Sequence, residues 1–345
     1  MRSRALVLLA FTAALLLSND VRAELWRRAG RVRIGPVSSL PGGLGLLPLL
    51  PDDPNNPITP AKVELGRQLF EDPRLSGDES LSCASCHPKE MGYAEAVPFS
   101  TGFAGKLMPR HTPTLLNSAY NRYINWDGKF ANVPELVLAV MANPKNMNMQ
   151  DERVLVKRLE AVPEYREQFD KVFGAPPNKQ RVALALDAYV RRLVTRNSPF
   201  DRYAMGDPRA LTDAQKRGLV LFVGKADCAM CHRGPNFADD QFHALGVNGN
   251  DEGRFKVTGV EADRYAFRTP TLRNVELTAP YMHDGSGATL RGVVDFYNAG
   301  GGRQQPKTPL LRPLQLTEKE KSDLVAFLES LTGAVEQLES KTAAR

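Results

Sequence analysis

Two Cys-x-x-Cys-His motifs constrain this chain more than any other feature. They contain all four of its cysteines. In such a motif two thiols can form thioethers with the vinyl groups of a porphyrin, and the histidine can ligate the iron through an imidazole nitrogen. The sequence therefore predicts two covalent c-type haems. The attachment residues are Cys83, Cys86 and His87 in the first motif and Cys228, Cys231 and His232 in the second.

A zinc site, a redox-active cysteine pair and a disulfide are the alternatives to haem. Structural zinc sites of this kind combine two Cys-x-x-Cys pairs a short loop apart, whereas the second pair here begins at Cys228, far from Cys83. A redox pair does not require a histidine at the next position, and does not require it twice. Four cysteines committed to haem leave none for disulfides, so packing and the cofactors must stabilise the fold.

The first 23 residues have the pattern of a secretory signal peptide. Arg2 and Arg4 precede an apolar run over residues 5–17, and a small-residue cleavage site ends at Ala23. The run is shorter than the roughly 20 apolar residues that span a membrane. We therefore expect a cleaved signal, no stable membrane span and export to the periplasm. Export agrees with c-type haem attachment, which takes place outside the bacterial inner membrane.

The charge of the chain argues against a nucleic-acid partner. The formal net charge is +6, and the basic residues are spread along the sequence without a Lys/Arg block. The mature chain is long enough for two domains of ordinary size.

Helical periodicity and capping residues predict a mainly α fold. Residues 24–58 are rich in Pro and Gly and are expected to form an extended N-terminal arm. Thr59-Pro60 then starts the first helix, and Thr212 and Thr317 open capping boxes with Gln215 and Glu320. Further helices are expected over residues 133–141, 151–161, 181–196, 212–223, 289–298 and 317–331, with a short β piece at 255–258.

The order of helix, haem motif, loop and helices occurs twice. Residues 65–70, LGRQLF, precede the first motif as residues 218–222, GLVLF, precede the second. This weak internal repeat predicts two cytochrome-c-like haem domains in tandem with long loops. The first is expected over residues 59–205 and the second over 206–345, because Pro and Gly cluster near 198–211.

Six stretches of the chain resemble the bacterial di-haem cytochrome c peroxidase family, including its MauG-type members. They follow one another in family order from Leu65 to Leu290, and the resemblance covers the chain to about Leu331. They are LGRQLFEDPRLS, SCASCH, RHTPTLLNSAY, WDGK, CAMCHRGPNF and FRTPTLRNVELTAPYMHDGSGATL. A series of this kind is specific, whereas one haem motif alone would not be.

The resemblance assigns roles to two aromatic residues. Trp126, in the WDG stretch, matches the tryptophan that lies between the two haems, so it is expected to relay electrons; the alternative is a core tryptophan. Tyr297 matches the axial position of the second haem iron, where peroxidases have a methionine and MauG-type members a tyrosine. The alternative is a core tyrosine on a helix face. His283, the nearest motif histidine, is expected to be structural or to support an iron ligand from behind.

The distal side of the first haem departs most from the family. Phe103 stands where its peroxidases have a distal histidine, a loss shared with MauG-type members. Asn146 aligns with the catalytic glutamate, and Leu136 and Val140 align with a glutamine and a proline of the pocket. An asparagine can donate a hydrogen bond but cannot take up a proton at neutral pH.

Loss of that glutamate makes fast peroxide turnover doubtful. General acid–base help is worth about 10²–10⁴-fold, or about 3–5 kcal/mol of barrier. Glu135 and Glu152 are the nearest carboxylates in the sequence that could replace it.

A calcium ion lies between the domains in the family, bound in part by backbone carbonyls. Thr278 and Pro280 match two of the ligand positions, but the asparagine ligand aligns with His111. Imidazole is a poor substitute for an oxygen ligand of a hard cation, so the sequence leaves calcium binding open.

The resemblance implies an exported di-haem oxidoreductase. Hydrogen peroxide, or O₂, would react at the first haem, and the second haem would pass electrons through Trp126. The electron donor would be a small cytochrome, a cupredoxin or a protein substrate modified by oxidation. A non-catalytic electron carrier or haem-ligand sensor is the second hypothesis, because apolar pockets bind diatomic gases. A structural zinc protein is the third.

Overall fold

The computed structural model describes residues 40–247 and 249–336. The predicted signal peptide and the first part of the arm lie outside the described residues. Within the described part, no helix has the length and apolar character needed to cross a membrane.

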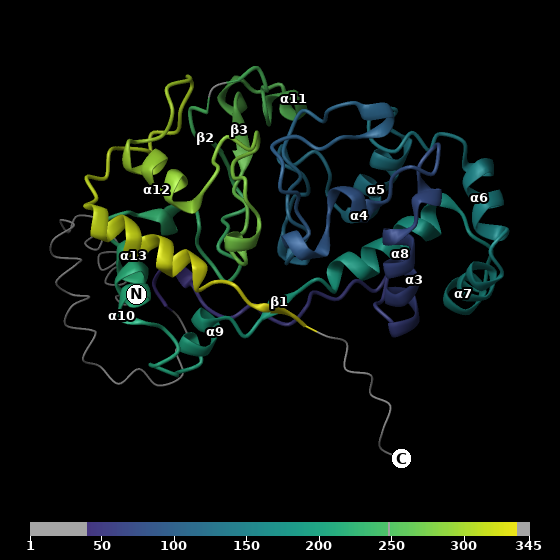
Figure 1. Cartoon of the computed structure of the whole chain (residues 1–345), viewed down its shortest axis with the longest axis horizontal. Helices are drawn as coiled ribbons and strands as arrows, with labels where there is room; N and C mark the ends of the chain where they lie inside the picture. The colour runs from purple at the N-terminus through teal and green to yellow at the C-terminus, as the bar shows by residue number, and fades with distance from the viewer. Residues whose placement is uncertain (1–39, 248, 337–345) are drawn as a thin grey trace, which may run out of the picture.

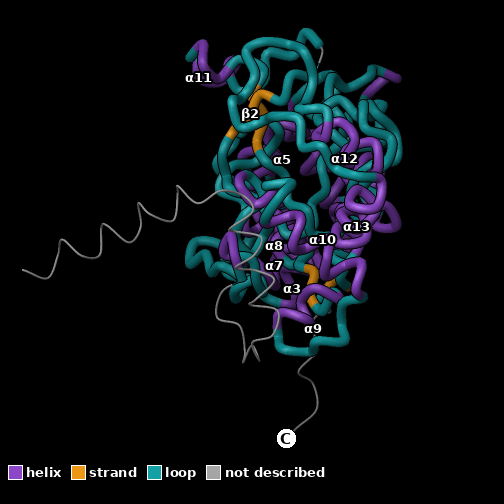
Figure 2. Tube along the Cα trace, turned by 90° about the vertical axis from the view of Figure 1, so that its left-hand side faces the viewer, coloured by secondary structure: helices purple, strands orange, loops and turns teal. Residues whose placement is uncertain are grey.

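Helices joined by long loops make up the described chain, which confirms the mainly α prediction (Figure 2). The helices are α3 (Pro60–Glu71), α4 (Cys83–Cys86), α5 (Val133–Ala142), α6 (Glu152–Glu160), α7 (Pro163–Phe173), α8 (Lys179–Arg191), α9 (Pro199–Ala204), α10 (Asp213–Val223), α11 (Phe255–Thr258), α12 (Leu290–Asn298) and α13 (Glu318–Glu329). Four short strands, β1 (Thr195–Arg196), β2 (Phe242–Ala244), β3 (Ala266–Arg268) and β4 (Ala334–Val335), form two antiparallel pairs, β1 with β4 and β2 with β3.

Side-chain caps fix where the longer helices begin. The Thr59 hydroxyl accepts from the Lys62 backbone N–H at the start of α3. The capping boxes predicted at Thr212 and Thr317 are both present at the starts of α10 and α13. These caps satisfy N–H groups that have no partner within the helix.

Two predicted elements differ from the structure. The helix expected over 181–196 ends at Arg191, because Asn117 accepts a hydrogen bond from the Thr195 backbone N–H at 2.8 Å and draws that segment into strand β1. Residues 255–258 form the short helix α11, not a β piece; Gly259, with φ of 68°, ends it. The sequence analysis also missed α7, whose Tyr165 and Phe169 face the core one turn apart.

Two hydrophobic cores divide the chain into two lobes, which Figure 1 shows side by side. Leu193 belongs to the first core and Phe200 to the second, so α9 packs with the second lobe, ahead of the predicted division at residue 206. The described part of the arm contacts both lobes. Leu44 is buried in the second core, and the Asn56 side chain donates a hydrogen bond to Asp187 of the first lobe at 2.8 Å.

The same helix crossing occurs in each lobe and explains the internal repeat. In the first lobe α3 packs on α8, and in the second α10 packs on α13. A Cβ on Gly66 would lie 2.0 Å from the Ala185 carbonyl oxygen, and a Cβ on Gly218 would lie 2.0 Å from that of Asp323. Both helix pairs therefore depend on a glycine for their close approach.

Candidate functional site

The first motif folds so that its histidine is prepared for metal binding. Residues 83–86 form the single turn α4, and Cys83 packs against the first core. The Nδ1 atom of His87 lies 2.9 Å from the carbonyl oxygen of Tyr93. A neutral imidazole has one N–H, so this hydrogen bond places the proton on Nδ1 and leaves the lone pair on Nε2. Burial lowers the pKa of His87 to about 4, which keeps the ring neutral.

The second motif repeats this arrangement. Residues 228–230 form one 3-10 turn, and Nδ1 of His232 lies 2.9 Å from the carbonyl oxygen of Phe237. Burial lowers the pKa of His232 as well. All four cysteines are free thiols, two in each lobe, which is against a disulfide and against a four-cysteine zinc site.

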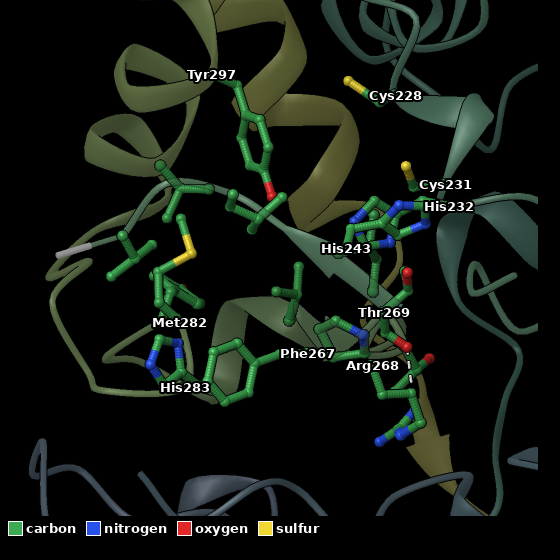
Figure 3. A pocket seen from close by; sticks show the side chains of 18 of the residues that line it. Cys228, Cys231, His232, His243, Phe267, Arg268, Thr269, Met282, His283 and Tyr297 are labelled. Atoms are coloured by element: carbon green, nitrogen blue, oxygen red, sulfur yellow. Dashed lines mark hydrogen bonds between the residues drawn. The ribbon is translucent and has the colours of Figure 1, made fainter. Parts of the chain in front are cut away.

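A cavity opens beside the second motif, and its lining comes from both lobes. Cys228, Cys231 and His232 lie along one side (Figure 3). Tyr297 of α12 points its phenol into the cavity, and Trp126 joins the lining from the first lobe. The cavity therefore brings together the predicted attachment residues, the predicted axial tyrosine and the predicted relay tryptophan.

The surroundings of Tyr297 do not resemble those of an ordinary core tyrosine. Its hydroxyl makes no hydrogen bond with any described residue, whereas buried tyrosine hydroxyls usually find a partner. Burial raises the pKa of Tyr297. Leu290 and Val294, on the same helix, enter the second core and hold α12 in place. The free hydroxyl is consistent with a ligand role in the cavity.

Trp126 is fixed from both lobes. Its indole N–H donates to the carbonyl oxygen of His111 at 2.8 Å, and its own carbonyl oxygen accepts from the Arg268 backbone N–H at 2.8 Å. The neighbouring Asp127 forms an ion pair with Arg110 at 2.7 Å, and Arg110 also binds Asp251 of the second lobe at 2.6 Å. The tryptophan is therefore held at the junction of the two lobes.

Two of the predicted distal residues of the first haem, Phe103 and Asn146, lie in contact through their backbones. The Phe103 backbone N–H donates to the carbonyl oxygens of Lys145 and Asn146, at 3.0 Å and 2.9 Å. The side-chain Oδ1 of Asn146 is buried and has no hydrogen-bond partner in the described chain. Val140, on α5, packs against the same core as Cys83, while Leu136 is half-buried. This unpartnered oxygen is the kind of group that a bound ligand or water would satisfy.

Glu135 and Glu152, the alternative acids, are both exposed and engaged at the surface. Glu135 accepts from the Asn132 side chain at 2.9 Å at the start of α5. Glu152 accepts from the Lys179 backbone N–H at 2.9 Å. Neither lies in an interior pocket, so neither is placed to supply the carboxylate that Asn146 lacks.

The residues at the calcium position do not fit a hard cation. His111 directs Nδ1 to the Val97 carbonyl oxygen at 3.0 Å, and its ring also interacts with the backbone of Thr278. Burial lowers the pKa of His111. Thr278 and Pro280 lie with His111 in the cavity lining. The nitrogens of the His111 ring face backbone carbonyls of Val97 and Thr278, and the ring supplies no oxygen for a hard cation.

His283, predicted to be structural, stacks on Phe267 with ring centroids 3.6 Å apart. It lies on the far side of the cavity from the attachment residues (Figure 3). Phe267 in turn lies beneath the Arg110 guanidinium, so His283 supports the junction between the lobes.

Sequence reasoning missed several polar residues around the second motif. Cys231, Asp239 and His243 place their ligand atoms within 4.8 Å of one another. His243 bonds to Asp239 at 2.9 Å, and this contact, with a second one to Cys231, raises the pKa of His243 to about 9. The raised pKa favours the protonated ring, which is a poor metal ligand. The spacing of four residues was the only signal for the Asp239–His243 pair. Arg268 was also missed, although it lies in a stretch that carries the resemblance.

Comparison with known proteins agrees with this geometry. The family model described as "Di-haem cytochrome c peroxidase" matches residues 60–209, and the model "Cytochrome c" matches residues 215–332. The methylamine utilization protein MauG of Methylorubrum extorquens is 42% identical over 82% of this chain and 81% of its own length. The cytochrome c551 peroxidase of Pseudomonas aeruginosa is 37% identical over 82% of each chain.

A solved structure extends the likeness to three dimensions. It is the crystal structure of a MauG-like protein associated with microbial copper homeostasis, 33% identical, with a TM-score of 0.78 over 83% of this chain and 95% of that one. Two haem-binding lobes, each with a neutral histidine after a cysteine pair, accord with these relatives. The chain is a peroxidase-like haem oxidoreductase that belongs to the di-haem cytochrome c peroxidase family.

Proposed function

We propose that this protein is an exported enzyme with two covalent c-type haems, which uses peroxide, or O₂, as oxidant at the first haem. Electrons would come from the second haem through Trp126. The observation that carries the proposal is the repeated histidine geometry: His87 and His232 each donate Nδ1–H to a backbone carbonyl at 2.9 Å. Such a bond orients the ring and makes the other nitrogen a better iron ligand.

Two haems per chain should be visible as mass. After export in a host that attaches c-type haem, intact-protein mass spectrometry should show the mature chain plus two haem groups. The control is the double variant Cys228→Ser with Cys231→Ser, which should lose one haem and keep the other. A wild-type mass with one haem or none would refute the proposal. The same spectrum locates the mature N-terminus and so tests cleavage after Ala23.

Haem iron, when bound, supplies the redox chemistry, and the residues of the two lobes make its two sites unequal. Phe103 cannot ligate iron, so the first site keeps an open distal position above His87. At the second site Tyr297, which lines the cavity with His232, would offer a phenol as an iron ligand, and its hydroxyl has no other described partner. A phenolate is a hard anionic donor, which favours ferric iron and lowers the reduction potential.

Tyr297→Phe should therefore alter the second haem alone. We expect its low-spin optical and EPR signals to change and its reduction potential to rise, because the anionic ligand is lost. The first haem should keep its spectrum. Phe296→Leu is a matched control, since Phe296 contacts Tyr297 edge to face and offers no ligand atom. Spectra that do not change in Tyr297→Phe would return this residue to a packing role.

The reductant would be a small redox protein, such as a cytochrome c or a cupredoxin, or a protein that the enzyme oxidises. Relatives named as cytochrome c peroxidases and as MauG support both options. The relay role of Trp126 is supported by its burial at the junction of the lobes and by its place in the lining of the cavity beside the second motif. Export to the periplasm follows from the predicted signal peptide.

A non-catalytic electron carrier or haem-ligand sensor is the second candidate. The distal residues Phe103, Leu136 and Val140 are apolar, and Asn146 cannot act as a base, which favours ligand binding over peroxide cleavage. Spectra recorded during peroxide addition separate the two functions. An oxidised intermediate supports the enzyme, whereas an unaltered ferric spectrum supports the carrier or sensor.

A further inference from the structure

Arg268 is the one buried arginine of the described chain that forms no ion pair with a carboxylate. Three arginines are less than 9% exposed: Arg191 at 8%, Arg268 at 6% and Arg273 at 1%. Arg191 pairs with Asp187 at 2.9 Å, and Arg273 pairs with Asp201 at 2.9 Å. The remaining guanidinium, that of Arg268, has no described carboxylate oxygen within 4.0 Å.

Backbone carbonyls are the hydrogen-bond partners that Arg268 does have. Its guanidinium donates to the Thr269 carbonyl oxygen at 3.0 Å and to that of Asn125 at 3.3 Å. Two such bonds use part of its five N–H groups. The charge of Asp240 acts on the guanidinium, but only from beyond ion-pair distance. A buried charge is costly unless it is paired. Burial accordingly lowers the pKa of Arg268 to about 10.

The position of Arg268 indicates where the missing carboxylate comes from. It lines the same cavity as Cys228, Cys231 and His232, and Figure 3 shows it beside Thr269, well away from Tyr297. Another basic side chain of this lining, His243, is half-buried and already has its carboxylate in Asp239. A haem carries two propionate carboxylates, and arginine binds carboxylates through two parallel N–H donors.

We propose that Arg268 forms an ion pair with a propionate of the second haem and is a positioning residue for that haem. This inference rests on the proposed attachment of a haem at Cys228 and Cys231. Arg268 also donates its backbone N–H to the Trp126 carbonyl oxygen at 2.8 Å. One residue thus connects the edge of the second haem with the segment that carries the relay tryptophan.

The test uses the full holoprotein and three variants: R268Q, R268K and R312Q. Arg312 lines the same cavity but is exposed, so R312Q removes the same charge without a buried ion pair. Intact mass first establishes that each protein carries two haems. Spectroelectrochemical titration then measures the potential of the second haem, and resonance Raman spectroscopy reports the bending mode of its propionates.

We expect R268Q to lower the potential of the second haem, because a nearby positive charge favours the reduced, less positive haem. The propionate bending mode should shift in R268Q. R268K should hold the potential near wild type but shift the Raman mode, because an ammonium cannot form the two-pronged contact. R312Q should change neither quantity.

An R268Q protein with the wild-type potential and Raman spectrum would overturn the inference. Equal effects of R268Q and R312Q would also overturn it, because they would show only a distant charge effect. If R268Q does not accumulate, R268K decides: a shifted propionate mode supports the pair, and an unshifted mode refutes it. A wild-type protein with a single haem would instead refute the proposed function, so the two failures are distinguishable.

Discussion

Asn146→Glu should accelerate the reaction with hydrogen peroxide by about 10²–10⁴-fold, the range that general acid–base catalysis supplies. Cleavage of the O–O bond requires a proton to move from one peroxide oxygen to the other. The Asn146 side chain cannot carry it, although its Oδ1 is buried and unpartnered at the position where a carboxylate oxygen could act. Stopped-flow mixing with peroxide, followed through the optical spectrum of the first haem, measures the rate.

The gain should grow as the pH rises. A carboxylate introduced among Phe103, Leu136 and Val140 is partly desolvated, which raises its pKa above the ordinary value for glutamate. It must be ionised to accept the proton, so the acceleration is small below that raised pKa and complete above it. The pH profile of the variant should therefore rise through one ionisation that the wild-type profile lacks.

Asn146→Gln is the matched control, because it has the length of glutamate and no basic carboxylate. It should react as slowly as the wild-type protein. A wild-type protein that already reacts as fast as Asn146→Glu would show that another residue is the base. Absence of reaction in all three proteins would favour the carrier or sensor.

Gly218→Ala should cost about 1–3 kcal/mol of stability or more, as overpacking of a close contact does. The new Cβ would lie 2.0 Å from the Asp323 carbonyl oxygen and 2.6 Å from the Cβ of Phe327, so α10 and α13 must separate. These two helices contribute Leu219, Phe222, Leu324, Phe327 and Leu328 to the second core, against which Cys228 packs. Denaturant unfolding monitored by far-UV circular dichroism and by the second haem measures the loss.

Gly292→Ala is the control for that substitution. Gly292 also lies in a helix, α12, but its Cβ would meet only the Thr289 hydroxyl at 3.4 Å. Alanine is a better helix former by about 0.5–1 kcal/mol, so this variant should be as stable as the wild type or more stable. Equal stability of both variants would contradict the proposed role of the α10–α13 crossing.

The elements that sequence predicted well are those with local signals. Proline at the first helical turn, capping boxes and apolar spacing define α3, α10 and α13, because each signal lies within the helix it starts. The end of α8 was not predictable in this way. The helical pattern of the sequence continues beyond Arg191. However, the side chain of Asn117, far away in the sequence, forms two hydrogen bonds with Thr195 and holds it in strand β1.

The site residues likewise divide into those with a local sequence signal and those set by distant contacts. The cysteines and histidines of the two motifs are adjacent in sequence, so their chemistry could be read directly from the chain. Arg268 could not be recognised from its sequence, because an arginine becomes informative only when it is buried without a carboxylate. The contacts of His111 with Val97 and Thr278 could not be predicted either, because they join residues from both lobes that lie far apart in the sequence.

The most direct test of two unequal haems is EPR spectroscopy of the purified ferric protein before and after one equivalent of peroxide. The account predicts one high-spin and one low-spin signal of equal spin count. Peroxide should remove the high-spin signal, because only the first site, beside Phe103, has an open iron. Two low-spin signals that peroxide leaves unchanged would contradict the account.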